Sequence, residues 1–356
     1  MHFNDGGISR AYTAYIVRKT GFTLAMAGIL AMMLILAISL GAVNIPFADV
    51  VKTLAGASVT RQFDIIVWNI RLPQALTAIV AGAGLAVSGA VMQSVLKNPL
   101  GSPFTLGISH AAAFGAAFSV MVMGSGSMAS SFSDAVTITS PYVTTLAAFF
   151  FSMLAAGIIT LVARIRNASP EVMVLTGVAL GSLFTAATML LQFFADDVQL
   201  SAMVFWTFGD VARTSWKELG FIALVTLVSL VFFLANAWNY NAADAGDETA
   251  RGIGVRVERV RLMGMVMASL VSSVIIAFVG IIGFVGLVAP HMVRRLIGDD
   301  HRFLLPATAA TGGVLLLASD TVARLILSPH ILPVSVLTSF LGAPVFIYLI
   351  IKGYRR

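Results

Sequence analysis

RLPQALTAIVAGAGLAVSGAVMQSVLKNPL, residues 71 to 100, decides the fold class of this chain. Between Arg71 and Lys97 it holds 25 residues without a charged side chain. A helix rises about 1.5 Å per residue, so this run is long enough to cross a hydrocarbon core of about 30 Å. Gly82, Ala86 and Ala90 recur every four residues, a spacing that lets neighbouring helices pack closely in a membrane. The stretch therefore predicts a membrane-spanning helix inside a bundle.

The composition extends this interpretation to the whole chain. Of the 356 residues, 58% are hydrophobic and only 11% are charged, and the mean hydropathy is +0.95. Cysteine is absent, which excludes a disulfide scaffold and thiolate metal ligands. The net charge of +6 does not require nucleic acid, because the cytoplasmic loops of membrane proteins are themselves rich in Lys and Arg. The sequence predicts an all-α integral membrane protein.

Apolar runs bounded by charges, proline or glycine predict about ten transmembrane helices. Their ranges are 21–43, 72–96, 103–123, 141–163, 172–195, 219–237, 262–280, 281–297, 303–319 and 333–351. The first run follows Arg18 and Lys19 without a small-residue cleavage site, so we expect a retained span rather than a signal peptide. This gives a cytoplasmic segment 1–20, a single transmembrane domain 21–351 and a cytoplasmic tail 352–356.

The distribution of basic residues supports cytoplasmic N- and C-termini. With ten crossings, sixteen of the 22 Lys and Arg residues fall on the cytoplasmic side, as the positive-inside rule requires. The six outside are Lys52, Arg61, Arg71, Arg213, Lys217 and Arg324.

Residues 262–296 test the number of crossings, since they are too long for one ordinary span and short for two. Both ends are basic, so an even number of crossings is expected, with a turn in the glycine-rich segment Gly280–Gly286 and a short helix after it. The alternative, one tilted span, would place Arg294 and Arg295 outside.

The chain lacks three common sequence signatures of enzymes. The chain has no G-x-x-x-x-G-K-[ST] phosphate loop, no G-x-S-x-G and no H-E-x-x-H. We expect no catalytic residue, no metal site and no directly bound cofactor. The carboxylates lie almost entirely at loops or span ends, which disfavours a proton- or sodium-coupled carrier, because such carriers bury acids near the membrane centre.

The polar stretch NYNAADAGDETARGIGVRVERVR, residues 239–261, is exceptional, with eight charged residues. Acids at a helix start followed by Gly252 and Gly254 predict one short helix, and VRVERVR predicts a second that leads into the next span. Two short helices at the membrane face would offer a rigid knob to a partner. The alternative is a solvated loop that only fixes topology.

Several ordered motifs resemble the permeases of type II ATP-binding-cassette importers, which carry ferric siderophores, haem and cobalamin. Besides residues 71–100 they are LGIS (106–109), LTGVALG (175–181), FWTFGD (205–210), GDETARGIGV (246–255), GFVGLVAPHMVRRLIGDDHRFLLP (283–306) and SDTVARLILSPHILPVSVLTSFLGAPVFIYLI (319–350). The resemblance implies a type II importer fold, a homodimer in a bacterial or archaeal cytoplasmic membrane, and two separate ATPase subunits that bind ATP and Mg. It also implies a periplasmic or lipid-anchored binding protein. Neither nucleic acid nor an ATPase site of its own is expected.

The same resemblance implies roles for particular residues, within a coupling loop at 238–261. It assigns coupling to the ATPase to Gly246, Asp247, Glu248, Ala250, Arg251 and Gly254. It assigns the cytoplasmic gate to Asn98, Pro99, Leu100, Ser169, Pro170 and Glu171. Docking of the binding protein falls to Arg71 and Arg324, for which helix-end anchoring is the alternative, and the translocation path to His110, Trp206 and Asp210.

The sequence departs from the family pattern at Gln74, at Asp210 and at His110, positions that concern docking and the cargo path. A ferric siderophore is the expected cargo, with haem or cobalamin as the alternative. A proton-coupled secondary transporter is the alternative of another class.

Overall fold

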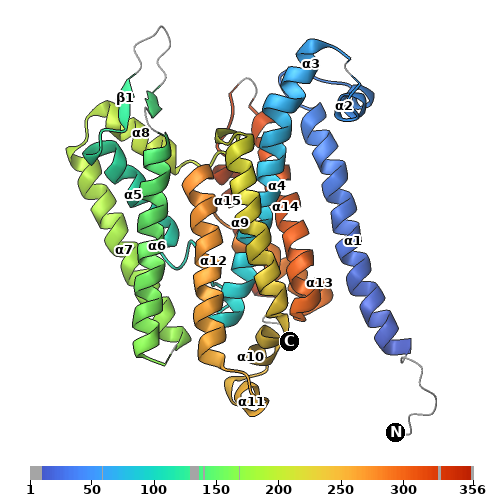
Figure 1. Ribbon diagram of the computed structural model, residues 1–356, viewed down its shortest axis with the longest axis vertical. Helices are drawn as coiled ribbons and strands as arrows, with labels where there is room; N and C mark the ends of the chain where they lie inside the picture. Colours follow the sequence, from blue (N-terminus) through green and yellow to red (C-terminus); the bar gives the residue numbers. More distant parts are fainter. Residues whose placement is uncertain are drawn as a thin grey trace.

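The computed structural model describes residues 10–57, 59–128, 136–138, 141–167, 169–327 and 330–353. Parts of the predicted N-terminal segment and C-terminal tail, residues 1–9 and 354–356, lie outside this range. The helices are α1 (Arg10–Ser39), α2 (Phe47–Leu54), α3 (Arg61–Ile65), the π-helix η1 (Ile66–Arg71), α4 (Leu72–Val95), α5 (Ile108–Val122), α6 (Pro141–Ile165), α7 (Pro170–Phe194), α8 (Asp197–Thr207), the 3₁₀ turn η2 (Val211–Arg213), α9 (Trp216–Ala235), α10 (Ala237–Asp244), α11 (Asp247–Gly252), α12 (Val257–Val279), α13 (Val285–Ile297), α14 (His301–Leu325) and α15 (Val334–Gly353). Long helices run roughly side by side in one bundle (Figure 1).

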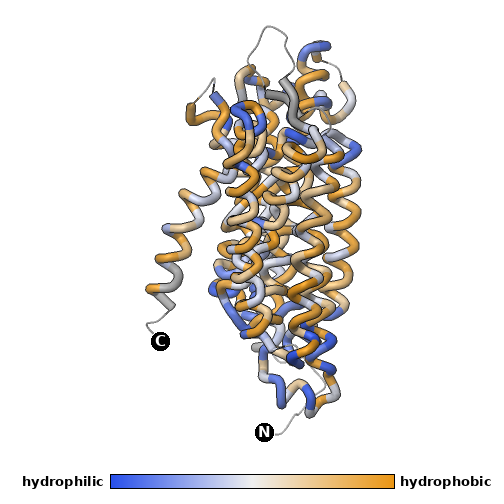
Figure 2. The backbone as a smooth tube through the Cα atoms, turned by 90° about the vertical axis from the view of Figure 1, so that its left-hand side faces the viewer, coloured by the Kyte–Doolittle hydropathy of each residue, from blue (hydrophilic) through white to orange (hydrophobic). Residues whose placement is uncertain are grey.

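The predicted all-α membrane fold is confirmed. Each of the ten predicted ranges contains a helix. Among the described residues, seven helices are long and apolar enough to cross a membrane, and α5 and α15 are shorter apolar helices. Figure 2 shows the apolar residues along the length of the bundle and polar residues gathered at its two ends. The number of crossings and the side on which the termini lie stay predictions.

The third predicted range begins too early. Residues 103–107 form a turn, and α5 begins at Ile108. Gly107 has a φ of 75°, a left-handed conformation that interrupts a helix. Thr105 stabilises the turn because its hydroxyl donates to the carbonyl of Leu100 at 2.9 Å.

The sequence did not predict the short helical segments α2, α3, η1, α8, η2 and α10, nor a hairpin of β1 (Gly126–Met128) with β2 (Val136–Ile138). The start of α8 carries a readable signal. Asp196 and Gln199 form a capping box, in which each side chain accepts a hydrogen bond from the other residue's backbone N–H. The same reciprocal pair of Ser215 and Glu218 begins α9.

The predicted break between the seventh and eighth helices is confirmed. Helix α12 ends at Val279 and α13 begins at Val285. Gly280 ends α12 with a φ of 85°, and Phe284, with a φ of 65°, precedes α13. The result is a short helix of 13 residues after a non-helical turn.

Helix α4 forms the centre of the bundle, and small residues let it approach α13 and α14. A Cβ on Gly89 would overlap the carbonyl group of Gly286 in α13, and one on Gly82 would overlap that of Gly312 in α14. These backbone contacts confirm that the small-residue spacing reflects close helix packing. We call these two pairs the glycine contacts. Helix α15, in contrast, leaves the bundle at an angle (Figure 2).

Candidate functional site

The polar stretch forms two short helices at one end of the bundle, here called the α11 end (Figure 1). One is α11, as predicted. The second is α10, which continues the direction of α9 after a break at Asn236, whose φ and ψ of −99° and 6° are not helical. The prediction of a separate helix in VRVERVR was wrong, because residues 257–261 are the first turns of α12.

The predicted coupling residues build α11 itself. Gly246 precedes the helix with a φ of 118° and Gly254 follows it with a φ of 88°, so both ends need the conformational freedom of glycine. Ala250 is fully buried and fastens one face of α11 to the bundle. Glu248 is exposed, and Arg251 forms an exposed ion pair of 2.5 Å with Glu258, which raises the pKa of the Arg251 guanidinium.

Asp247 links α11 to two other elements. Its carboxylate lies 2.6 Å from Lys97 Nζ and 2.7 Å from Arg261 Nη2. Lys97 belongs to the turn between α4 and α5, and the guanidinium of Arg261 also donates to the Val95 carbonyl at 3.1 Å. Burial alone would raise the pKa of Asp247, but hydrogen bonds from Lys97 and Arg261 outweigh it and hold the pKa below its ordinary value. The carboxylate is therefore ionised at neutral pH. We call Lys97, Asp247 and Arg261 the ion triad.

Helix α10 is held to α4 and α14 by polar contacts. Ser94 donates a hydrogen bond of 2.6 Å to Asp244. The side chain of Asn241 donates to Asp300 at 2.9 Å and accepts from the backbone N–H of His301 at 2.8 Å. Burial raises the pKa of Asp244 despite the Ser94 hydrogen bond and the nearby Arg294. A displacement of α10 would therefore move the ends of α4 and α14 with it.

The predicted gate residues lie in two turns at this same end. In the turn of residues 96–107, here the gate turn, Asn98 Oδ1 accepts from the backbone N–H of Leu100 at 2.9 Å, and Leu100 and Pro99 are exposed. This side-chain hydrogen bond stabilises a local turn, and the side chain of Leu100 is exposed on that turn.

The second set of gate residues begins α7. Ser169 precedes the helix and donates to the Glu171 carboxylate, and Pro170 is the first helical residue. The charges of Arg261 and Lys97 reach Glu171, so this turn and the ion triad share one electrostatic environment. Apposition across a two-fold axis stays a prediction.

Arg71 is used inside the subunit. It is 6% exposed, and its guanidinium donates to the carbonyls of Ile38 at 2.6 Å, Ser39 at 3.1 Å and Val43 at 2.5 Å. These are carbonyls at and just beyond the end of α1, which have no intrahelical partner. The observed geometry matches helix-end anchoring.

Arg324 is also engaged by its own chain. Its Nε donates to Asp320 Oδ2 at 3.0 Å and its Nη2 to the Ala37 carbonyl at 3.3 Å. Gln74 donates to the other oxygen of Asp320 at 3.0 Å. Docking through Arg71 and Arg324 stays a prediction, and it would have to compete with these internal contacts.

The predicted path residues have local contacts instead of converging on one described cavity. His110 in the first turn of α5 is half-buried, with its ring centroid 5.0 Å from that of Phe104. Trp206 is buried in an apolar cluster with Ala112 and other small residues. Asp210 accepts from the N–H of Ala212 at 2.8 Å and begins η2. A role in the path stays a prediction for all three.

Sequence reasoning missed Lys97 and Arg261 as site residues. The signal available was that each is a cation directly at the end of a long apolar helix, while Asp247 was already assigned to the coupling loop. Pairing them required the arrangement of α4, α11 and α12 in space, which spacing along the chain does not give.

Residues 13–352 match the FecCD transport family. A protein of Methanocaldococcus jannaschii assigned as an ABC transporter permease is 49% identical over 349 residues, covering 98% of this chain and 99% of the relative. The hemin transport system permease protein of Yersinia pestis is 35% identical, covering 92% and 96%. A solved inward-facing structure of a metal-chelate type ABC transporter is 28% identical, with a TM-score of 0.80, covering 94% of this chain and 99% of the other. The chain therefore belongs to the FecCD transport family and is a membrane-embedded permease of the metal-chelate type of ABC importer.

Proposed function

We propose that this chain moves a ferric siderophore across a cytoplasmic membrane as a homodimer. In this proposal two ATPase subunits bind ATP and Mg at the α11 end, and a periplasmic or lipid-anchored protein delivers the chelate at the opposite end. Relatives named for Fe(3+)-citrate and siderophore transport, each covered to more than nine tenths of its length, support an iron chelate. Relatives named for hemin and vitamin B12 keep haem and cobalamin as alternatives.

The ion triad is the observation that supports coupling to an ATPase. Helix α11 is exposed at the tip of the bundle, yet Asp247 ties it to the gate turn through Lys97 and to α12 through Arg261. A partner that pushes on α11 would thereby move residues next to Asn98 and Leu100. This short connection can convert movement of an ATPase into a change at the gate.

The homodimer is supported by the exposed apolar surface of α15. Phe340, Leu341, Ile347 and Tyr348 are exposed on a helix that has left the bundle. Such an apolar surface must be covered either by lipid acyl chains or by a second subunit. In this proposal the second subunit supplies the other copy of Leu100 that the gate requires.

Uptake by the reconstituted importer tests the proposal. The full-length chain, its ATPase and its binding protein are placed in liposomes, and entry of a labelled ferric siderophore, haem and cobalamin is measured with ATP inside. We expect ATP-dependent entry of the siderophore, and none when the ATPase is omitted. If only haem or cobalamin enters, the proposed cargo is wrong and that compound takes its place. If a proton gradient drives entry without ATP, the chain is a secondary transporter instead.

A further inference from the structure

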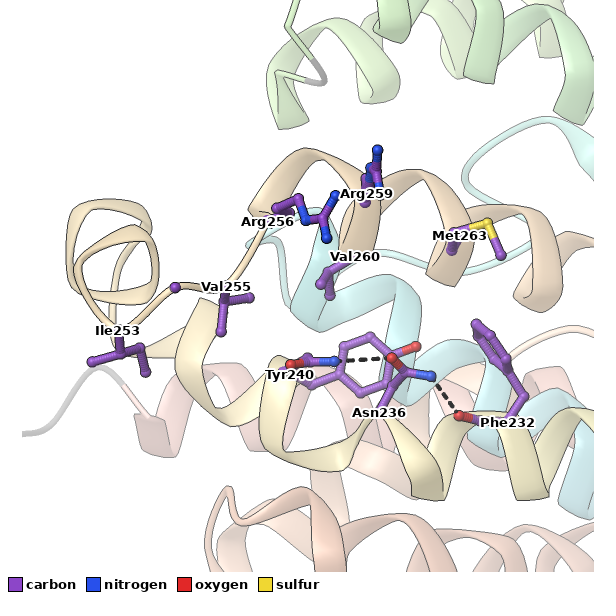
Figure 3. Close-up of a pocket in the computed structure, with 11 residues that line it drawn as sticks. Phe232, Asn236, Tyr240, Ile253, Val255, Arg256, Arg259, Val260 and Met263 are labelled. Atoms are coloured by element: carbon purple, nitrogen blue, oxygen red, sulfur yellow. Dashed lines mark hydrogen bonds between the residues drawn. The ribbon is translucent and has the colours of Figure 1, made fainter.

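A cavity of about 490 Å³ lies at the α11 end between α9, α10 and the start of α12. This volume falls within the range of roughly 300 to 1,000 Å³ that small-molecule pockets occupy. Figure 3 shows Tyr240 and Asn236 on one side, Arg256, Arg259 and Val260 on the other, and Phe232 and Met263 at one end. Neither the ion triad nor the gate turn lines it. We call it the α9–α12 pocket.

Two cations at this pocket lack partners. Arg256 and Arg259 are exposed, and among the described residues neither guanidinium has a hydrogen bond or an ion pair. Several other basic residues at this end are paired with acids, among them Lys97, Arg251, Arg261, Arg294 and Arg302. Two unpaired guanidinium groups one turn apart favour an anionic ligand with several oxygens, such as a phosphate.

The opposite wall includes the side chain of Tyr240. Tyr240 is 1% exposed and lines the pocket, and among the described residues its hydroxyl makes no hydrogen bond. Asn239 donates to Asn236 Oδ1 at 3.0 Å, and Asn236 donates to the Phe232 carbonyl at 2.9 Å, so the two amides form a fixed polar rim. The Tyr240 hydroxyl therefore has hydrogen-bonding capacity left for an oxygen atom of a ligand bound in the pocket.

The pocket changes from polar to apolar along both helices in the same direction. On α9, Phe232 precedes Asn236 by four residues, and on α12, Met263 follows Arg259 by four, so each pair shares a helix face. Figure 3 shows Phe232 and Met263 at the end of the pocket opposite Ile253. The exposed surface beyond them is also apolar, with Val231 and Val266. A change from cationic to apolar side chains is what a site for both a lipid headgroup and its acyl chain requires.

We propose that the α9–α12 pocket binds an anionic phospholipid of the leaflet at the α11 end. Its phosphate lies between Arg256 and Arg259, and its acyl chain follows Phe232 and Met263 along the outside of the bundle. Basic pockets between membrane helices are suited to such headgroups. A free phosphate would use the cations but not the apolar end. An acidic side chain of a partner protein would likewise leave Phe232 and Met263 without a function.

Native mass spectrometry of the full-length chain in mild detergent tests the proposal, with phosphatidylglycerol and phosphatidylcholine as probes. The wild type should retain phosphatidylglycerol. The double variant Arg256→Gln/Arg259→Gln should retain it about 30-fold less, since two cations near a membrane surface together contribute about 2 kcal/mol. The matched control Arg164→Gln/Arg166→Gln removes the same charge from exposed positions at the end of α6 and should retain it like the wild type.

Other outcomes of this experiment would overturn the proposal or identify a different ligand of the α9–α12 pocket. Equal retention by the pocket variant and the wild type, or an equal loss in the control variant, overturns the proposal. Inorganic phosphate that displaces phosphatidylglycerol completely at millimolar concentration would assign the pocket to free phosphate. Unchanged lipid retention with lost affinity for the ATPase would assign Arg256 and Arg259 to a protein contact. Thermal unfolding of each variant separates these results from a failure to fold.

Discussion

Replacing Asp247 with asparagine should detach α11 from the gate turn while leaving both elements folded. The substitution keeps the size of the side chain but removes the charge that Lys97 and Arg261 share at 2.6 and 2.7 Å. Arg261 retains the Val95 carbonyl as an acceptor, so the helix start of α12 should stay in place. The change therefore acts on the connection more than on the fold.

The magnitude follows from how deeply each partner is buried. The side chains of Arg261 and Asp247 are 4% and 27% exposed. Surface pairs contribute about 0.2 to 1 kcal/mol, and breaking a buried pair costs about 3 to 5 kcal/mol. The Asp247–Arg261 pair lies between these limits, and the more exposed Lys97 adds little. We expect a loss of about 2 kcal/mol, which is roughly a 30-fold change in an opening equilibrium.

Hydrogen exchange of the α11 backbone amides measures this equilibrium directly. Exchange in residues 247–256 should accelerate about 30-fold at neutral pH in the Asp247→Asn variant, and uptake per ATP hydrolysed should fall in the reconstituted importer. Because the pKa of Asp247 is lowered, its stabilisation is complete above the ordinary value of 3.8 and is lost only as the pH falls through the lowered pKa. The difference from wild type should thus be constant from about pH 5 to 8.

The control is Arg251→Gln, which breaks the exposed pair with Glu258 on the same helix. This variant should accelerate exchange less than about fivefold, as expected for a surface pair. If both variants accelerate exchange equally, or if Asp247→Asn leaves uptake per ATP unchanged, the ion triad does not connect α11 to the gate turn.

Three further predictions concern other parts of the subunit. Gly89→Ala should destabilise the protein by about 1 to 3 kcal/mol or more through overlap with Gly286, whereas Gly157→Ala, which meets nothing within 4 Å, should be nearly neutral in thermal unfolding. Arg71→Ala should lower the unfolding temperature because three carbonyls lose their donor; unchanged stability with weaker binding-protein affinity would restore the docking role. Leu100→Cys, in a chain without native cysteine, should crosslink two subunits in the inward-closed state. If no crosslink forms in any nucleotide state, the gate is not at Leu100.

The sequence predicted helix positions well because an apolar run has few alternatives in a membrane. It also predicted the break at Gly280, since two basic ends required a turn there. It did not separate α10 from α9, because the break at Asn236 involves neither proline nor glycine. It extended the third span into residues 103–107, because apolar residues in a turn look like apolar residues in a helix.

Predictions for the candidate site depended on whether a role is local or distant. The ends of α11 were predictable because Gly246 and Gly254 permit backbone conformations that few other residues adopt. The partners of Asp247 lie on elements far apart in the chain, and no local pattern connects them. Arg71 shows the converse, because its charge suggested a partner outside, whereas the carbonyls at the end of α1 are what it binds.

The glycine contacts have a mechanical consequence. At Gly82 and Gly89 the backbone of α4 contacts the backbones of α14 and α13 directly, with no side chain between them. Because no deformable side chains separate these helices there, they cannot easily slide or tilt independently. Force applied to Lys97 at the end of α4 is therefore not absorbed near the gate turn. The three helices should move as one rigid body. A small displacement at α11 should therefore produce a displacement of similar size at the far side of the membrane.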